Sequence, residues 1–308
     1  MQDERRPAGE MTALPDRRQV PIPGGEFLMG SERHYPEERP ARKVRVDPFR
    51  IDAYPVTNRR FREFVADTGH VTFAERPPDP SLYPGARPED LVPGSLVFGM
   101  TDGPVDLGDF RNWWSWTPGA DWRRPLGPGS SLDGLEDHPV VHVAYPDAVA
   151  FARWAGMRLP SEIEWEYAAR GGLEGAEFAW GDQDVQETVP RANTWQGAFP
   201  YENTELDGWT RTSPVGLYAP NGYGLYDMIG NIWEWTSTRY RESPPVAGSR
   251  CCGPPRRLDP FPSRTIKGGS HLCTIQYCFR YRPAARQPQT IDTSAGHIGF
   301  RCVSPDRP

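Results

Sequence analysis

Two cysteines have the clearest capacity for chemistry in this chain. Cys273 and Cys278 stand five residues apart in the segment KGGSHLCTIQYCFRYR. Side chains at this spacing do not share a helix face, so a loop or bend must bring the thiols together. A disulfide, half of a zinc site, a two-thiolate site for a soft metal and two free thiols all remain open. Zinc needs four ligands, whereas two thiolates alone suit Cu(I), which accepts low coordination and soft sulfur.

The other three cysteines show no such pattern. Cys251 and Cys252 are neighbours in a proline-rich stretch, where vicinal cysteines make poor disulfide partners, and we interpret them as incidental. Cys302 follows a predicted final strand, where a lone buried thiol is the expected state. Five cysteines, an odd number, in a chain of 308 residues do not form a disulfide scaffold.

Histidines and carboxylates give weaker metal signals. His138 and His142 would share an ion on a helix, but the valines around them predict a strand, where they would lie about 13 Å apart. We therefore assign them a structural role. Asp207, Asp227 and Glu234 stand among Asn, Gly and aromatic residues, a setting that suits Ca²⁺. The spacing is not that of an EF-hand, and solvated loop carboxylates are the alternative.

The elements that must position these residues are short. Alternation around a Gly-Gly turn predicts a strand or hairpin at residues 21–30, and apolar alternation and β-branched residues predict extended segments at residues 43–52 and 138–143. Apolar stripes with stop signals predict helices at residues 57–68, 147–155 and 161–170. The last helix carries a capping box of Ser161 and Glu164. Residues 73–135 are predicted to be irregular, with a tryptophan cluster that forms a satellite core or lines a cleft. Gly268 and Gly269 permit a tight backbone just before the cysteines.

Composition limits the class of protein. The 35 prolines and 31 glycines exclude a helical bundle, and 11 Trp, 12 Tyr and 13 Phe exclude a disordered chain. A net charge of −6 without a polybasic stretch excludes nucleic acid and anionic membranes as partners. No segment approaches the ~18 apolar residues of a membrane span. We predict a flexible tail over residues 1–20, without the apolar middle of a secretory signal, and one α+β domain over residues 21–304 in a cytoplasmic protein.

Four blocks of the chain resemble the formylglycine-generating enzyme family, also called sulfatase-modifying factors. The blocks are IPGGEFLMGSE with PVTNRRFREFV, DHPVVHVAYPDAVAFARWAGMRLPSEIEWEYAARGG, NTWQGAFP with PNGYGLYDMIGNIWEWT, and KGGSHLCTIQYCFRYRPAAR with HIGFRCV. The resemblance covers residues 21–303 and implies a single compact, C-type-lectin-like domain with low secondary-structure content. The first three blocks are shared by the wider superfamily, and the Ser270-x2-Cys273-x4-Cys278 pattern is typical of its catalytic branch.

The resemblance implies a copper-dependent oxidase. Members of this family convert a cysteine in a Cys-x-Pro-x-Arg segment of an unfolded or extended sulfatase to Cα-formylglycine with O₂, and we expect an external reductant as a further partner. Cys273 and Cys278 match the copper-binding pair and would hold Cu(I), and Ser270 matches the serine beside the metal. A groove of aromatic side chains would hold the peptide, and the residues expected to line it are Tyr277, Trp113, Trp114, Trp233 and His297.

The resemblance also implies two structural Ca²⁺ sites. The first is matched by the side chains of Asn193 and Asp207 and the backbone carbonyls of Thr194 and Trp209. The second is matched by the side chains of Asp227 and Glu234 and the backbone carbonyls of Gly230 and Ile232.

Five positions depart from the family pattern and leave the substrate open. They are His271, Thr274, Gln276, Gln289 and His297, where the family usually has an aromatic residue, His, Ser, Asn and Asn. We expect His271 to pack, and the role of His297 stays open. The alternatives are a copper oxidase of the same fold acting on a different peptide or small-molecule thiol, and a non-catalytic lectin-like binding module. An iron-dependent oxygenase of the superfamily would need a helical His/Glu ligand set, which we do not find.

Overall fold

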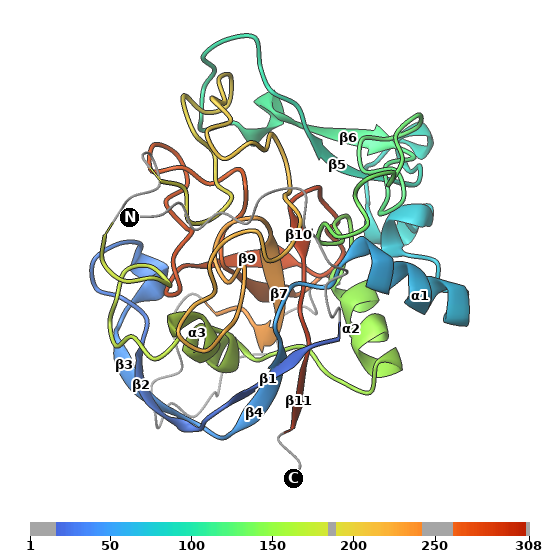
Figure 1. Ribbon diagram of the computed structural model, residues 1–308. Helices are drawn as coiled ribbons and strands as arrows, with labels where there is room; N and C mark the ends of the chain where they lie inside the picture. The colour runs from blue at the N-terminus through green and yellow to red at the C-terminus, as the bar shows by residue number, and fades with distance from the viewer. Residues whose placement is uncertain (1–16, 184–188, 242–260, 306–308) are drawn as a thin grey trace, which may run out of the picture.

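The computed structural model describes residues 17–183, 189–241 and 261–305 (Figure 1). Within these ranges the α-helices are α1 (Asn58–Thr68), α2 (Tyr145–Trp154) and α3 (Glu162–Arg170). The strands are β1 (Gln19–Ile22), β2 (Gly25–Met29), β3 (Arg42–Val46), β4 (Phe49–Asp52), β5 (Gly94–Phe98), β6 (Trp114–Pro118), β7 (Trp233–Arg239), β8 (Ser263–Lys267), β9 (Arg286–Thr290), β10 (Ile298–Gly299) and β11 (Val303–Pro305). Short 3₁₀ turns lie at Pro36–Glu38, Phe73–Glu75, Pro80–Leu82, Pro88–Asp90 and Phe110–Asn112. The predicted α+β class with little regular structure is confirmed.

The helices form where the sequence predicts them, because their ends carry strong caps. In α3 the Ser161 hydroxyl accepts from the Glu164 amide at 3.2 Å, and the Glu164 carboxylate accepts from the Ser161 amide at 2.8 Å. This reciprocal pair satisfies two amides that the helix itself leaves unpaired. Gly69 and Gly171 end α1 and α3 in the left-handed region, at φ 66° and 58°. Helix α2 begins two residues earlier than predicted, at Tyr145.

The strands pair differently from the expected local hairpin. Segment 21–30 contains parts of two strands that pair elsewhere: β1 lies against β4 in a three-stranded sheet, β1-β4-β11, and β2 pairs with β3. A four-stranded sheet, β10-β7-β8-β9, occupies the middle of the molecule (Figure 1). Strands β5 and β6 form a two-stranded ribbon inside residues 73–135, so the prediction of a wholly irregular region is wrong.

The strand predicted at residues 138–143 is absent from the described chain. The segment is buried, but its backbone bonds to irregular neighbours: the Val140 amide donates to the Val56 carbonyl at 2.8 Å and the His142 amide to the Ala295 carbonyl at 3.0 Å. His142 has φ 60°, which ends any extended run. The irregular hydrogen-bond partners and the positive φ of His142 therefore outweigh the β-propensity of the valines.

The N-terminal boundary of the domain differs from the predicted one. Strand β1 begins at Gln19, inside the segment predicted as a tail, and residues 1–16 lie outside the described ranges. Cys251 and Cys252 also lie outside them. Cys302 is a free, fully buried thiol, as predicted. In the described part of the chain, no helix is long and apolar enough to cross a bilayer.

Two apolar clusters hold the fold together. The larger packs the three helices against the central sheet and includes the fully buried Trp165, Trp235 and Phe300. The smaller is aromatic and lies beside the cysteine loop, and its buried members are Phe98, Trp113, Trp195, Phe199 and Leu272. The tryptophan-rich region thus contributes to a satellite core, as predicted, because Trp113 lies in that second cluster.

Candidate active site

The two cysteines lie in the long connection between antiparallel strands β8 and β9. Gly268 and Gly269 open this loop with φ 97° and 72°. A Cβ atom on Gly269 would lie 2.8 Å from the Tyr281 amide nitrogen, so glycine is required for the chain to fold back on itself here. The Cys278 amide then donates to the Thr274 carbonyl at 2.9 Å, which closes a turn between the cysteines.

This turn brings the thiols into contact. The Cys273 and Cys278 sulfur atoms are 3.2 Å apart, and both residues are free cysteines. Burial raises the pKa of the Cys273 thiol well above its usual value. The hydrogen bond from Cys273 and the positive charge of Arg280 lower the pKa of Cys278. Of the two thiols, Cys278 is therefore the one that gives up its proton more readily.

A cavity of about 290 Å³ opens above the sulfur atoms. All eight residues predicted for catalysis and substrate binding line it: Ser270, Cys273, Cys278, Tyr277, Trp113, Trp114, Trp233 and His297. The lining also includes residues that the sequence analysis missed, which are Phe199, Leu272, Arg280 and Gln287. Leu272 and Arg280 belong to the cysteine loop itself, so their proximity to the cysteines in the sequence could have predicted that they line the cavity. Phe199 and Gln287 reach the cavity only through tertiary packing.

Aromatic rings form one wall of the cavity. Tyr277 stacks on Phe199 with ring centroids 4.7 Å apart, and Trp113 meets Tyr277 edge-on at 5.3 Å. Tyr277 is 36% exposed, so the wall continues to the molecular surface. Such a surface provides large apolar contact area with polar edges, which suits an extended peptide.

Ser270 and His297 supply polar groups to the same cavity. Ser270 is fully buried; its Oγ accepts from the Leu272 amide at 3.3 Å, and within the described chain no residue accepts its hydroxyl hydrogen. His297 packs on Trp114 with ring centroids 4.6 Å apart. Its Nδ1 atom is buried and makes no hydrogen bond with the described residues. Burial lowers the pKa of His297 to about 3, so the imidazole is neutral.

The first predicted calcium loop contains oxygen atoms that lack a positive partner. The Asn193 Oδ1 atom is buried and has no hydrogen-bond donor among the described residues. Burial raises the pKa of Asp207 to about 6, although the Trp209 amide and the Tyr218 hydroxyl donate to its carboxylate. A buried amide oxygen and a buried carboxylate are ligands that a hard cation prefers.

The second predicted calcium loop is more crowded. Burial raises the pKa of Asp227 to about 6, and the negative charge of Glu234 adds to the rise. Glu234, however, already accepts from Arg301 in contacts of 2.7–3.0 Å and from the Trp165 indole at 2.8 Å. Its carboxylate is therefore neutralised by a buried guanidinium.

Backbone hydrogen bonds join both predicted calcium loops to the cysteine loop. The Asn231 amide donates to the Asn193 carbonyl at 2.8 Å, and the His271 amide donates to the Asn231 carbonyl at 3.0 Å. The Trp195 amide donates to the Cys273 carbonyl at 3.0 Å. The predicted calcium loops are thus hydrogen-bonded directly to the backbone that carries the thiols.

Comparison with known proteins identifies the family. Residues 6–305 match the family described as sulfatase-modifying factor enzyme 1-like domain. The chain is 57% identical over 292 residues to the formylglycine-generating enzyme of Mycobacterium tuberculosis, in an alignment that covers 92% of this chain and 97% of that protein. The chain belongs to the formylglycine-generating enzyme family.

Further comparisons agree with this assignment. The formylglycine-generating enzyme of Streptomyces coelicolor is 47% identical over 299 residues, which cover 94% of this chain and 89% of that protein. The chain is accordingly an enzyme. The structure of PvdO from Pseudomonas aeruginosa aligns over 94% of this chain and 95% of that chain with a TM-score of 0.61 and 24% identity, a likeness of fold alone. The fold expected for the formylglycine-generating enzyme family is confirmed.

Only one of the five departures from the formylglycine-generating enzyme pattern faces the cavity. His271 bonds through Nδ1 to the Asn231 carbonyl at 2.8 Å and packs behind the loop, as predicted. Thr274, Gln276 and Gln289 also lie outside the lining. His297 is the exception, and it is therefore the departure best placed to affect a bound substrate.

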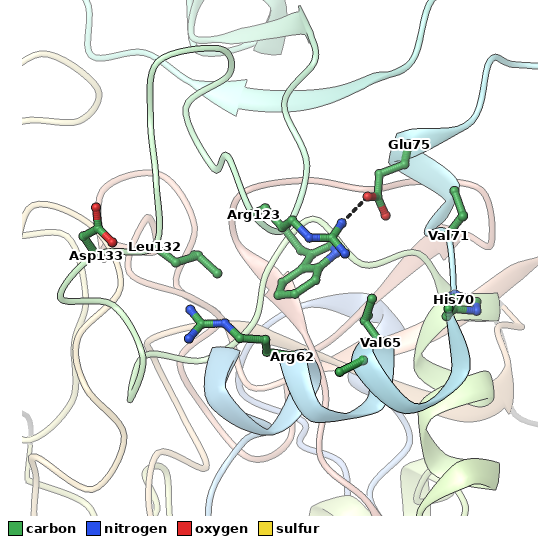
Figure 2. Close-up of a pocket in the computed structure, with 11 residues that line it drawn as sticks. Arg62, Val65, His70, Val71, Glu75, Arg123, Leu132 and Asp133 are labelled. Atoms are coloured by element: carbon green, nitrogen blue, oxygen red, sulfur yellow. Dashed lines mark hydrogen bonds and ion pairs between the residues drawn. The ribbon is translucent and has the colours of Figure 1, made fainter.

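A separate cavity of about 620 Å³ lies over α1 and contains none of the predicted site residues (Figure 2). Arg123 crosses this cavity and is ion-paired with Glu75, while its guanidinium stacks on Trp122 at 4.3 Å. The positive charge of Arg123, in the middle of this cavity, is thus already paired within the protein. The cysteine cavity is the smaller of these two, and it is the one of the two that combines free thiols with an aromatic wall.

Proposed function

We propose that this protein is a copper-dependent oxidase that converts a cysteine of a sulfatase-type Cys-x-Pro-x-Arg segment to Cα-formylglycine. The observation that carries the proposal is the pair of free thiols, 3.2 Å apart, that opens into an aromatic-walled cavity. The names of the relatives support the product, and a cytoplasmic location remains a prediction. A non-catalytic binding module would have no need for two free thiols in contact at the base of its groove.

The donor set fits Cu(I). Two soft sulfur ligands and an open approach from the cavity match its low coordination number. Cys273 and Cys278 would hold the ion. When bound, copper would activate the substrate thiol and reduce O₂.

The redox balance requires an external reductant. The substrate CH₂SH group loses two electrons and two protons to become a thioaldehyde, which water hydrolyses to the aldehyde with release of H₂S. Reduction of O₂ to water takes four electrons, so the reductant supplies the other two. In this scheme the Ser270 hydroxyl donates a hydrogen bond into the cavity, and Tyr277, Trp113 and Trp233 shield the reacting atoms from bulk water.

Oxygen uptake tests the copper requirement. We expect the purified protein, supplied with Cu(I), a thiol reductant and a Cys-x-Pro-x-Arg peptide, to consume O₂ only while peptide remains. A Cu(I)-selective chelator should stop uptake, and added copper should restore it. The same uptake with a peptide in which Ser replaces the cysteine would exclude peptide oxidation as its cause. Turnover of unrelated thiols at the same rate would favour a copper oxidase with a different substrate.

His297→Asn should alter turnover without altering copper binding. Asn offers a donor and an acceptor on one amide, whereas the neutral imidazole offers them on opposite ring edges. We expect the kcat/KM for a Cys-x-Pro-x-Arg peptide to change by at least about threefold, or roughly 0.65 kcal/mol of transition-state stabilisation. Gln289→Asn is the matched control, because it also restores the family residue but lies outside the cavity. Equal kinetics for His297→Asn and the native protein would assign His297 to packing.

We further propose that Ca²⁺ binds at the two loops and stabilises the fold. The unpartnered Asn193 Oδ1 atom and the raised pKa of Asp207 support the first site, where the Thr194 and Trp209 carbonyls would complete the ligands. At the second, Asp227 with the Gly230 and Ile232 carbonyls would bind the ion beside Glu234. The Glu234–Arg301 ion pair makes that site the weaker candidate.

Chelation tests the first calcium site. A ligand at a hundred times its Kd stabilises the native state by about 2.7 kcal/mol, so EDTA should lower the Tm of the native protein by several degrees. Asp207→Ala should lower the Tm and reduce the further effect of EDTA, because only the weaker second site would remain. Glu202→Ala, an exposed acid on the same segment, should behave like the native protein. If EDTA leaves the Tm of the native protein unchanged, the structural calcium is refuted.

A further inference from the structure

A third cavity, of about 500 Å³, lies between α3, the β2–β3 pair and the end of β7. Its charged lining residues are Glu37, Glu38, Glu162, Glu166, Arg42, Arg239, Arg241 and Arg286. One wall is apolar and comprises Met29, Val44, Ile163 and Ala284. Charged and apolar residues thus meet on a volume that suits a small organic ligand, within the usual range of about 300–1,000 Å³.

The acids of this cavity are already neutralised by cations of the protein. The pairs are Glu37 with Arg280 at 2.7 Å, Glu38 with Arg282 at 2.6 Å, Glu162 with Arg286 at 2.7 Å, and Glu166 with Lys267 at 2.9 Å and Arg170 at 2.8 Å. Most of these partners are buried, so the pairs are fixed parts of the fold. Their carboxylates are not available to balance further positive charge.

Three lining arginines remain without an acid. Within the described chain, Arg42, Arg239 and Arg241 form no ion pair. Arg42 is half-buried, and its Nη2 atom lies 3.4 Å from the Met29 sulfur, which is a weak acceptor. Strand alternation directs Arg42 and Val44 to the cavity, whereas Lys43 and Arg45 are exposed and do not line it. The cavity therefore carries an excess of guanidinium groups.

We propose that this cavity binds a small phosphomonoester with an apolar body. Guanidinium groups bind phosphate oxygens in a bidentate fork, and three of them favour a dianion over a monoanion. The apolar wall would hold the organic part of the ligand. A sulfate ester offers similar oxygens with a single negative charge, so it should bind more weakly. This site is separate from the cysteine cavity and does not depend on the reaction proposed there.

Calorimetry at fixed ionic strength tests the proposal with phenyl phosphate, phenyl sulfate and benzyl alcohol as probes. We expect phenyl phosphate to bind to the native protein, phenyl sulfate to bind more weakly, and benzyl alcohol not to bind. Arg42→Ala and Arg239→Ala should each raise the Kd for phenyl phosphate by about tenfold or more. Lys43→Ala and Arg45→Ala are matched controls on the opposite face of β3 and should leave it unchanged.

Three results would overturn the site. They are no binding of phenyl phosphate to the native protein, equal affinity for phenyl phosphate and benzyl alcohol, and equal losses in Arg42→Ala and Lys43→Ala. Thermal unfolding separates a binding defect from misfolding, because Arg239 is exposed and Arg239→Ala should keep the native Tm in the absence of ligand. Phenyl phosphate should then raise the Tm of the native protein more than that of Arg239→Ala at the same concentration.

Discussion

Cys278→Ser should abolish high-affinity Cu(I) binding and lower turnover of a Cys-x-Pro-x-Arg peptide by at least about a thousandfold, or about 4 kcal/mol of transition-state stabilisation. Serine removes the sulfur of the thiol whose pKa is lowered, and a hydroxyl is a poor ligand for a soft ion. Cys273→Ser should lose binding for the same reason. Competition with a coloured Cu(I) chelator measures the affinity, and peptide kinetics measure the turnover.

The remaining cysteines provide the controls for this experiment. Cys302→Ala removes a fully buried thiol. The backbone of Cys302 is hydrogen-bonded to Asp52 and not to the cysteine loop. The Cys302→Ala variant should keep the native Cu(I) affinity even if its free energy of unfolding falls. Cys251→Ser and Cys252→Ser should also keep it. Loss of copper in a Cys251/Cys252 double variant would contradict the assignment of the pair in the β8–β9 loop.

Glu234→Ala should lower the free energy of unfolding by about 3–5 kcal/mol, because it leaves the buried Arg301 guanidinium without its counterion. The Arg301 side chain is fully buried, and its Nη2 atom lies 2.7 Å from the Glu234 carboxylate. The substitution also removes the acceptor of the Trp165 indole. Urea denaturation, monitored by tryptophan fluorescence, gives the free energy for each variant.

The control is an ion pair of the same length on the surface. Arg17 and Glu63 also lie 2.7 Å apart, but their side chains are 72% and 47% exposed, so Glu63→Ala should cost less than about 1 kcal/mol. The Glu234→Ala measurement is repeated in EDTA. A loss that persists there comes from Arg301, whereas a loss that disappears comes from bound calcium. A loss as small as that of Glu63→Ala would show that Arg301 is compensated by other groups.

Local signals in the sequence were sufficient for the helices and for the cysteine loop. The Ser161–Glu164 capping box and the glycines after α1 and α3 act within a few residues, so their effect can be read from the chain. Gly268 and Gly269 likewise predict the tight turn before Cys273. The spacing of Cys273 and Cys278 alone left several uses of the pair open, and the candidate site could be assembled in advance because its residues match the pattern of the formylglycine-generating enzyme family.

Long-range pairing could not be predicted in the same way. Strand β1 pairs with β4, and β4 also pairs with β11 near the other end of the chain, so the strand or hairpin predicted at residues 21–30 does not form a local hairpin. The valines near His142 favour a strand, but the segment is enclosed by irregular chain that offers no ladder. Buried ion pairs such as Lys267–Glu166 were also invisible, because charge in a sequence normally indicates exposure.

The mass of the peptide product tests the central claim most directly. The protein is incubated with Cu(I), O₂, a reductant and a peptide containing Cys-x-Pro-x-Arg, and the peptide is then analysed by mass spectrometry with and without an aminooxy reagent. The proposed function predicts the mass for replacement of CH₂SH by CHO, with an aldehyde that the reagent captures and that is absent with Cys278→Ser. An unchanged peptide, or one converted only to a disulfide or a sulfur oxyacid, would contradict the account.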